Sequence, residues 1–181
     1  DITDCQNGIG WIYNNGLGVN KSIDKALYWY KLAAEQNHKE AQYNIGLIYL
    51  NDNLNYESKL IALKWFSLSA KQGLPEAQYN LASMYFDGVG VTQDFTKAFK
   101  YFLMSAENGL SISQYQLSEM YSNGWGVNKS TIKSFMWANI SASQGHEESI
   151  NKRNQLLSEL KNEEIQKGQK LSLECFSKKL K

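Results

Sequence analysis

Apolar side chains recur along this chain at helical spacing, and the pattern repeats every 36 residues. A small residue marks position 1 of each repeat, at Cys5, Ala41, Ala77, Ser113 and Ser149. Positions 5, 8 and 9 are apolar or aromatic in each of the first four repeats, so the spacing i, i+4, i+7, i+8 predicts one buried face of an α-helix. A fixed period of this length is typical of stacked helical repeats rather than of one globular core.

A second helix is predicted after a turn in each repeat. Glycines in a Gly-x-Gly-Val turn end the first helix at Gly16, Gly88 and Gly124, because glycine readily adopts positive φ. The second repeat carries Asp52-Asn53-Leu54-Asn55 there, without a change in length. Position 18 offers N-cap residues for the second helix, and position 33 offers residues that tolerate a left-handed C-terminal end. These residues are Ser22, Ser58, Asp94 and Ser130 at position 18, and Asn37, Gly73, Gly109 and Gly145 at position 33.

The predicted fold is therefore all-α, an α-solenoid of antiparallel helix pairs. Position 6 is kept small (Gly10, Gly46, Ala82, Ser118), which lets the two helices of a pair approach closely. The four repeats span 5–40, 41–76, 77–112 and 113–148. Residues 149–181 are expected to form capping helices and a basic tail, because a solenoid needs its open end covered.

The repeat resembles the Sel-one-like repeat (SLR) family, a bacterial and eukaryotic relative of the tetratricopeptide repeat. The third repeat carries the matching residues Ala77, Tyr79, Leu81, Tyr85, Gly88, Gly90, Val91, Lys97, Ala98, Tyr101, Phe102, Ala106 and Gly109. Residues 149–176 also resemble the terminal segment of bacterial members. The resemblance implies a non-enzymatic scaffold or adaptor that binds a protein or peptide in a concave groove lined by the first helices.

In that reading, positions 3, 7, 10 and 11 of each first helix lie off the buried face and line the groove. Large apolar groups such as Trp11, Leu50 and Phe86 stand there without an evident structural need, although packing between adjacent repeats is an equal alternative. The expected partner-contacting residues are Trp11, Asn14, Tyr43, Leu47, Leu50, Asn51, Tyr79, Ser83, Phe86, Asp87, Tyr115, Glu119 and Asn123. Trp125, in the turn of the last repeat, is a further possible contact.

Catalysis finds little support in the sequence, and we expect neither a cofactor nor a metal. The two histidines, His38 and His146, stand at the same repeat position three repeats apart, and we expect both to be turn residues exposed to water. The alternative function is small-molecule binding or β-lactam hydrolysis, as in cysteine-rich bacterial relatives. Their recurring cysteine pairs are absent, and Cys5 and Cys175 are expected to be too far apart for a disulfide.

Composition sets limits on partners and compartment. A net charge of +1 gives no overall attraction to nucleic acid, and no apolar run is long enough to span a bilayer. The expected partner is a protein or peptide, and the chain is expected to be a monomer. Because the chain starts at Asp1, we expect any signal peptide to have been removed, which leaves periplasm, secretion and cytoplasm open. The Asn-, Lys- and Ile-rich composition favours a bacterial source.

Overall fold

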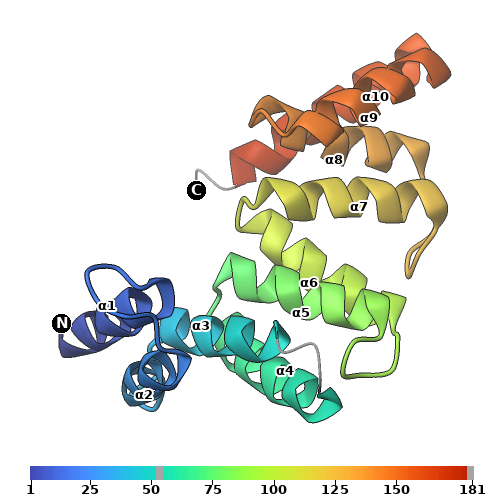
Figure 1. Cartoon of the computed structure of the whole chain (residues 1–181). Coiled ribbons are helices and arrows are strands. Elements are labelled where there is room, and N and C mark those ends of the chain that lie inside the picture. Colours follow the sequence, from blue (N-terminus) through green and yellow to red (C-terminus); the bar gives the residue numbers. More distant parts are fainter. Residues whose placement is uncertain (52–54, 179–181) are drawn as a thin grey trace. The chain divides into compact units, whose positions relative to one another are not determined.

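The computed structural model describes residues 1–51 and 55–178, with side chains as far as Cys175. Within these ranges the chain forms ten α-helices (Figure 1), which confirms the predicted all-α solenoid. They are α1 (Ile2–Asn15), α2 (Ile23–Ala34), α3 (Lys39–Leu50), α4 (Tyr56–Lys71), α5 (Pro75–Asp87), α6 (Phe95–Glu107), α7 (Ser111–Asn123), α8 (Thr131–Ser143), α9 (Glu147–Glu159) and α10 (Asn162–Lys178). The expected turn at Asp52-Asn53-Leu54 and the end of the basic tail lie outside the described residues.

The helices fall into two compact units. Helices α1 to α5 belong to residues 1–93, and helices α6 to α10 belong to residues 94–181. In the first unit α1 packs on α2 and α3 packs on α4, while α2 contacts α3 and α4 contacts α5. In the second unit α7 packs on α8, and α8 also contacts α9 and α10. Helix α3 is thus held by the second helices on either side of it in sequence, α2 and α4, and helix α7 by α6 and α8.

Small residues at position 6 bring paired helices close together, as the sequence predicts. A Cβ added to Gly10 would lie 2.6 Å from the Tyr30 ring, and one added to Gly46 would lie 2.7 Å from the Phe66 ring. Both rings are fully buried, so neither has room to move aside. The glycine lets a large aromatic side chain of the second helix lie directly on the backbone of the first.

Helix ends follow the predicted chemistry, with one exception. Ser22, Asp94 and Ser130 each cap their helix by accepting a backbone N–H, and Asn37 has the left-handed φ of 65° expected of it. The predicted cap Ser58 is wrong: it lies buried inside α4. Asn55 caps that helix instead, with its side-chain oxygen 3.0 Å from the Glu57 nitrogen. The helix starts one turn early because Asn55 is itself a good N-cap residue.

The terminal helices of the second unit pack on α8. Gly168 of α10 lies so close to α8 that an added Cβ would be 2.5 Å from the Phe135 ring. Leu156, Leu160 and Ile165 complete the cluster around Phe135 and Ala138. The side chain of Phe176, another expected member of the cap, lies outside the described residues. Residues 149–175 thus cover the apolar side of α8, and their capping role stays a prediction.

Candidate protein-binding surface

Two of the predicted partner-contacting residues line an open hollow in the first unit, the Ile23 hollow. It has a volume of about 510 Å³. Its walls come from α1, α2 and α3 and the residues that follow or precede them. The lining residues are Asn14, Lys21, Ile23, Leu27, Ile48, Tyr49 and Asn51. The repeat brings these together because positions 10 and 11 end neighbouring first helices on the same side of the unit.

Three more predicted residues meet in a smaller hollow between α3 and α5. Leu50, Ser83 and Asp87 line this Leu50 hollow, which measures about 100 Å³, together with Asn80, Met84 and Val89. Asp87 is exposed and Ser83 is half-buried. Three of the predicted residues therefore converge in the valley between the consecutive first helices α3 and α5.

Tyr43 has a structural role within this surface. Its ring lies 5.8 Å from that of the buried Phe66, and its hydroxyl accepts a hydrogen bond of 3.5 Å from the Asn80 side chain of the next first helix. Burial raises the pKa of the Tyr43 hydroxyl, so this group stays protonated at neutral pH. An analogous bridge joins Asn44 to Asn7 at 3.0 Å. Tyr43 and Asn7 both stand at position 3, and both contact an adjacent repeat. At these two residues the structure therefore shows the alternative to partner contact, which is packing between repeats.

The second unit has its own hollow, between α7 and α9. Tyr115 and Glu119, both predicted, line this Glu119 hollow of about 350 Å³ with Glu148, Asn151, Lys152 and Gln155. Lys152 lies 2.7 Å from Glu119, and both side chains are largely shielded from water. Burial raises the pKa of Tyr115, and the nearby carboxylates of Glu119 and Glu148 raise it further. This hollow therefore presents an internally paired charge and a phenol that stays neutral.

The remaining predicted residues differ in exposure. Trp11 is 52% exposed on α1, and Leu47 is half-buried on α3. Tyr79 and Phe86 are half-buried on α5 and engage other residues of the chain. Asn123 is exposed and donates a hydrogen bond to the Glu119 carbonyl. Trp125, 37% exposed, stacks on Phe95 with ring centroids 6.3 Å apart.

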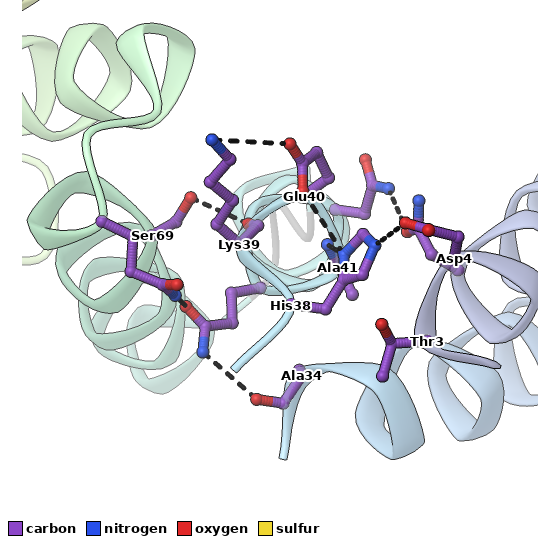
Figure 2. Close-up of polar contacts among 12 residues, drawn as sticks. Thr3, Asp4, Ala34, His38, Lys39, Glu40, Ala41 and Ser69 are labelled. Atoms are coloured by element: carbon purple, nitrogen blue, oxygen red, sulfur yellow. Dashed lines mark hydrogen bonds and ion pairs between the residues drawn. The ribbon is translucent and has the colours of Figure 1, made fainter. Parts of the chain in front are cut away.

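The expectation that both histidines are water-exposed turn residues is wrong. The His38 side chain is 9% exposed, and its Nδ1 accepts the Ala41 N–H as the N-cap of α3. Because Nδ1 accepts, the proton sits on Nε2, which donates to Asp4 at 2.9 Å (Figure 2). That hydrogen bond lowers the pKa of Asp4. His146 caps α9 in the same way through the Ser149 N–H, and its ring lies 5.3 Å from that of Tyr115.

Comparison with known proteins identifies this helical architecture. The Sel1 repeat family matches residues 3–38, 39–74, 75–110 and 111–146, with the same 36-residue period. The chain belongs to the Sel1 repeat family. These matches begin two residues before the repeats counted from position 1. A protein-interaction role is typical of Sel1 repeats, which are helical scaffolds.

Solved Sel1-like structures resemble the whole chain. A protective antigen of uropathogenic Escherichia coli with an SLR fold aligns over 97% of this chain with a TM-score of 0.89 and 30% identity. A Sel1 repeat protein from Oxalobacter formigenes aligns over 81% with a TM-score of 0.76 and 29% identity. A sel1-like repeat-containing protein of Acanthamoeba polyphaga mimivirus is 45% identical over 40 residues, 22% of this chain. The chain spans 38%, 60% and 8% of these three proteins, respectively.

A ladder of glutamines between Sel1 repeats was not foreseen from the sequence. The position 2 residues Gln42, Gln78 and Gln114 each donate a buried hydrogen bond of 3.2 Å to an alanine carbonyl in the preceding second helix. Gln72 and Gln144 in turn donate to Gln42 and Gln114, both at 2.8 Å. The signal was available, because glutamine stands at position 2 of all four repeats. These side chains set how one first helix sits on the repeat before it.

A metal site has no candidate in the part of the chain that the structure describes. No group of three or more His, Cys, Asp and Glu side chains lies close enough there to hold a metal ion. Cys5 and Cys175 form no disulfide. Likewise, no described helix has the length and apolar character needed to cross a membrane. The features of this Sel1 chain that stand out are hollows between helices, which suit binding.

Proposed function

We propose that this Sel1 repeat chain is a scaffold that binds a protein or peptide segment on its first-helix surface, the side chains at positions 3, 7, 10 and 11. One observation carries the proposal. Side chains at these positions line open hollows in each unit, at Asn14 and Asn51, at Leu50, Ser83 and Asp87, and at Tyr115 and Glu119. Of these residues, Asn51 and Asp87 are exposed, which supports their access to a partner.

The geometry of the first unit favours an extended segment. Neighbouring helices pack about 8–10 Å apart, and an extended chain covers about 3.3 Å per residue. About three residues of an extended peptide therefore cover the distance between one helix and the next. The amide side chains of Asn14 and Asn51 can donate and accept hydrogen bonds, as a peptide backbone requires. The half-buried apolar groups Leu47 and Leu50 lie on the same helix and provide surface to bury.

The test is selection of binders followed by mapping. A random library of displayed dodecapeptides is panned on the immobilised chain, and hydrogen exchange is then measured with and without a selected peptide. We expect protection of α3 and α5 on the first-helix surface, with α2 and α4 unchanged. Protection confined to α2 or α4, or a library that returns no binder, would contradict the proposal.

A further inference from the structure

The Ile23 hollow combines apolar walls with a lysine, Lys21, that forms no ion pair with any residue that the structure describes. Ile23, Leu27 and Ile48 supply aliphatic surface, and Tyr49 adds an aromatic ring. With about 510 Å³ it falls within the size range of ordinary ligand pockets. One or two aliphatic side chains of a partner therefore fit within it.

The described polar residues of this hollow are one cation, two amides and one phenol, from Lys21, Asn14, Asn51 and Tyr49. Lys21 is its one charged lining residue, and in the part of the chain that the structure describes Lys21 makes no ion pair. Asn14 and Asn51 likewise make no side-chain hydrogen bond with any described residue, so their amides are open to a ligand. The Glu119 hollow is different, because Lys152 is paired there with Glu119 at 2.7 Å. A hollow between α4 and α5 also sets lysines beside aliphatic walls, with Lys64 and Lys71 near leucines. The Ile23 hollow differs from it in the two asparagine amides that stand beside its lysine.

Ile23 forms an exposed floor of the hollow, unlike the residues at the same position in the next two repeats. Ile23 stands at position 19, as do Lys59 and Phe95 in the next two repeats. A Cβ added to Gly90 would lie 2.8 Å from Lys59, and one added to Gly126 would lie 2.2 Å from the Phe95 carbonyl, so a glycine turn covers each. Ile23, by contrast, is 39% exposed.

We propose that the Ile23 hollow binds a peptide segment in which an aliphatic side chain neighbours a carboxylate. The aliphatic group enters between Ile23 and Ile48, where its burial supplies the main affinity. The carboxylate pairs with Lys21, and the two asparagines hydrogen-bond the peptide backbone. This inference rests on the proposed function and specifies the chemistry of the segment that is recognised.

The test uses methyl NMR of the chain labelled at isoleucine and leucine, with three capped pentapeptides as probes. Acetyl-Gly-Asp-Leu-Asp-Gly-amide is compared with the versions that carry Lys for Asp or Ser for Leu. We expect saturable shifts of the Ile23 and Ile48 methyl signals with the first peptide, and affinity at least about tenfold weaker for the other two, ~1.4 kcal/mol. Lys21→Glu should weaken the first peptide by a similar factor. Lys129→Glu, the same change at the same repeat position, should leave it unaltered.

Equal affinities for the Asp and Lys peptides, or equal effects of Lys21→Glu and Lys129→Glu, would overturn the inference. So would the absence of methyl shifts at millimolar peptide. If library-selected peptides still protect α3 and α5 in that case, the inference alone fails. If they protect nothing on the first-helix surface, the proposed function fails with it.

Discussion

The side-chain nitrogen of Gln72 lies 2.8 Å from the side-chain oxygen of Gln42, to which it donates a hydrogen bond. The side-chain nitrogen of Gln42 in turn donates to the buried carbonyl of Ala34. Gln42→Leu removes both bonds, and the Ala34 carbonyl then keeps only the Asn37 backbone N–H as its donor. We expect a loss of unfolding free energy of about 1–3 kcal/mol in urea denaturation, because two hydrogen bonds are lost and each contributes about 0.5–1.5 kcal/mol. Gln6→Leu is the matched control, because Gln6 accepts from Gln36 near the surface and donates to no carbonyl among the described residues. Equal losses for the two variants would contradict the ladder's role.

Two glycines of the first unit should respond oppositely to alanine. Gly46→Ala forces a methyl group against the buried Phe66 ring, so we expect destabilisation of about 1–3 kcal/mol from overpacking. Gly8, within α1, has nothing within 4 Å of an added Cβ. Gly8→Ala should therefore raise stability by up to about 1 kcal/mol through helix propensity. Thermal and urea unfolding of both variants decide this, and a neutral Gly46→Ala would show that the helices do not pack this closely.

Alkaline pH should weaken the fold through Tyr30. Burial raises the pKa of this phenol to about 12, above its ordinary value of 10.0. Between these values the unfolded chain releases the proton and the folded chain keeps it, so stability falls as pH rises through this window. A difference of about two pKa units corresponds to ~2–3 kcal/mol. Urea midpoints measured from pH 9 to 12 should show a shallower decline for Tyr30→Phe than for the wild type, and parallel declines would contradict this account.

Helix α10 should stabilise the fourth repeat through Gly168. Gly168→Val places two methyl groups where even a Cβ would lie 2.5 Å from Phe135, so we expect a loss of about 1–3 kcal/mol and a lower melting temperature. Leu173→Ser is the control on the same helix, because Leu173 is 71% exposed. A melting temperature unchanged by Gly168→Val would show that α10 does not hold α8, and would count against the predicted cap.

The fold could be predicted from the sequence because the same pattern of residues recurs in every repeat. The small residue at position 6 and the left-handed residue at position 33 each appear four times, so the close approach of Gly46 to Phe66 and the φ of Asn37 were both foreseeable. Ser58 was misplaced because two good N-cap residues stand three apart, and propensity alone does not choose between Asn55 and Ser58.

The surface was harder to predict, because exposure and contact depend on neighbours that periodicity does not specify. Position 3 was assigned to a partner, yet Tyr43 packs on Phe66 and bonds Asn80. The histidines were assigned to solvent because they lie in turns, and the capping capacity of Nδ1 was overlooked. The Ile23 hollow forms from three helices, and no single repeat contains all of its walls.

Binding on the first-helix surface is the central claim, and Ser83 and Asp87 probe it with least damage to the fold. Tyr79 and Phe86, also among the expected partner-contacting residues, engage other residues, so truncating them would also disturb packing. The decisive measurement is titration of a library-selected peptide into the wild type, the Ser83→Arg/Asp87→Arg variant and a Lys64→Glu control on α4. We predict at least about tenfold weaker binding by the double variant, ~1.4 kcal/mol, with helical circular dichroism and the control unchanged. Unchanged affinity in a folded double variant would contradict the claim and move the binding site off the first helices.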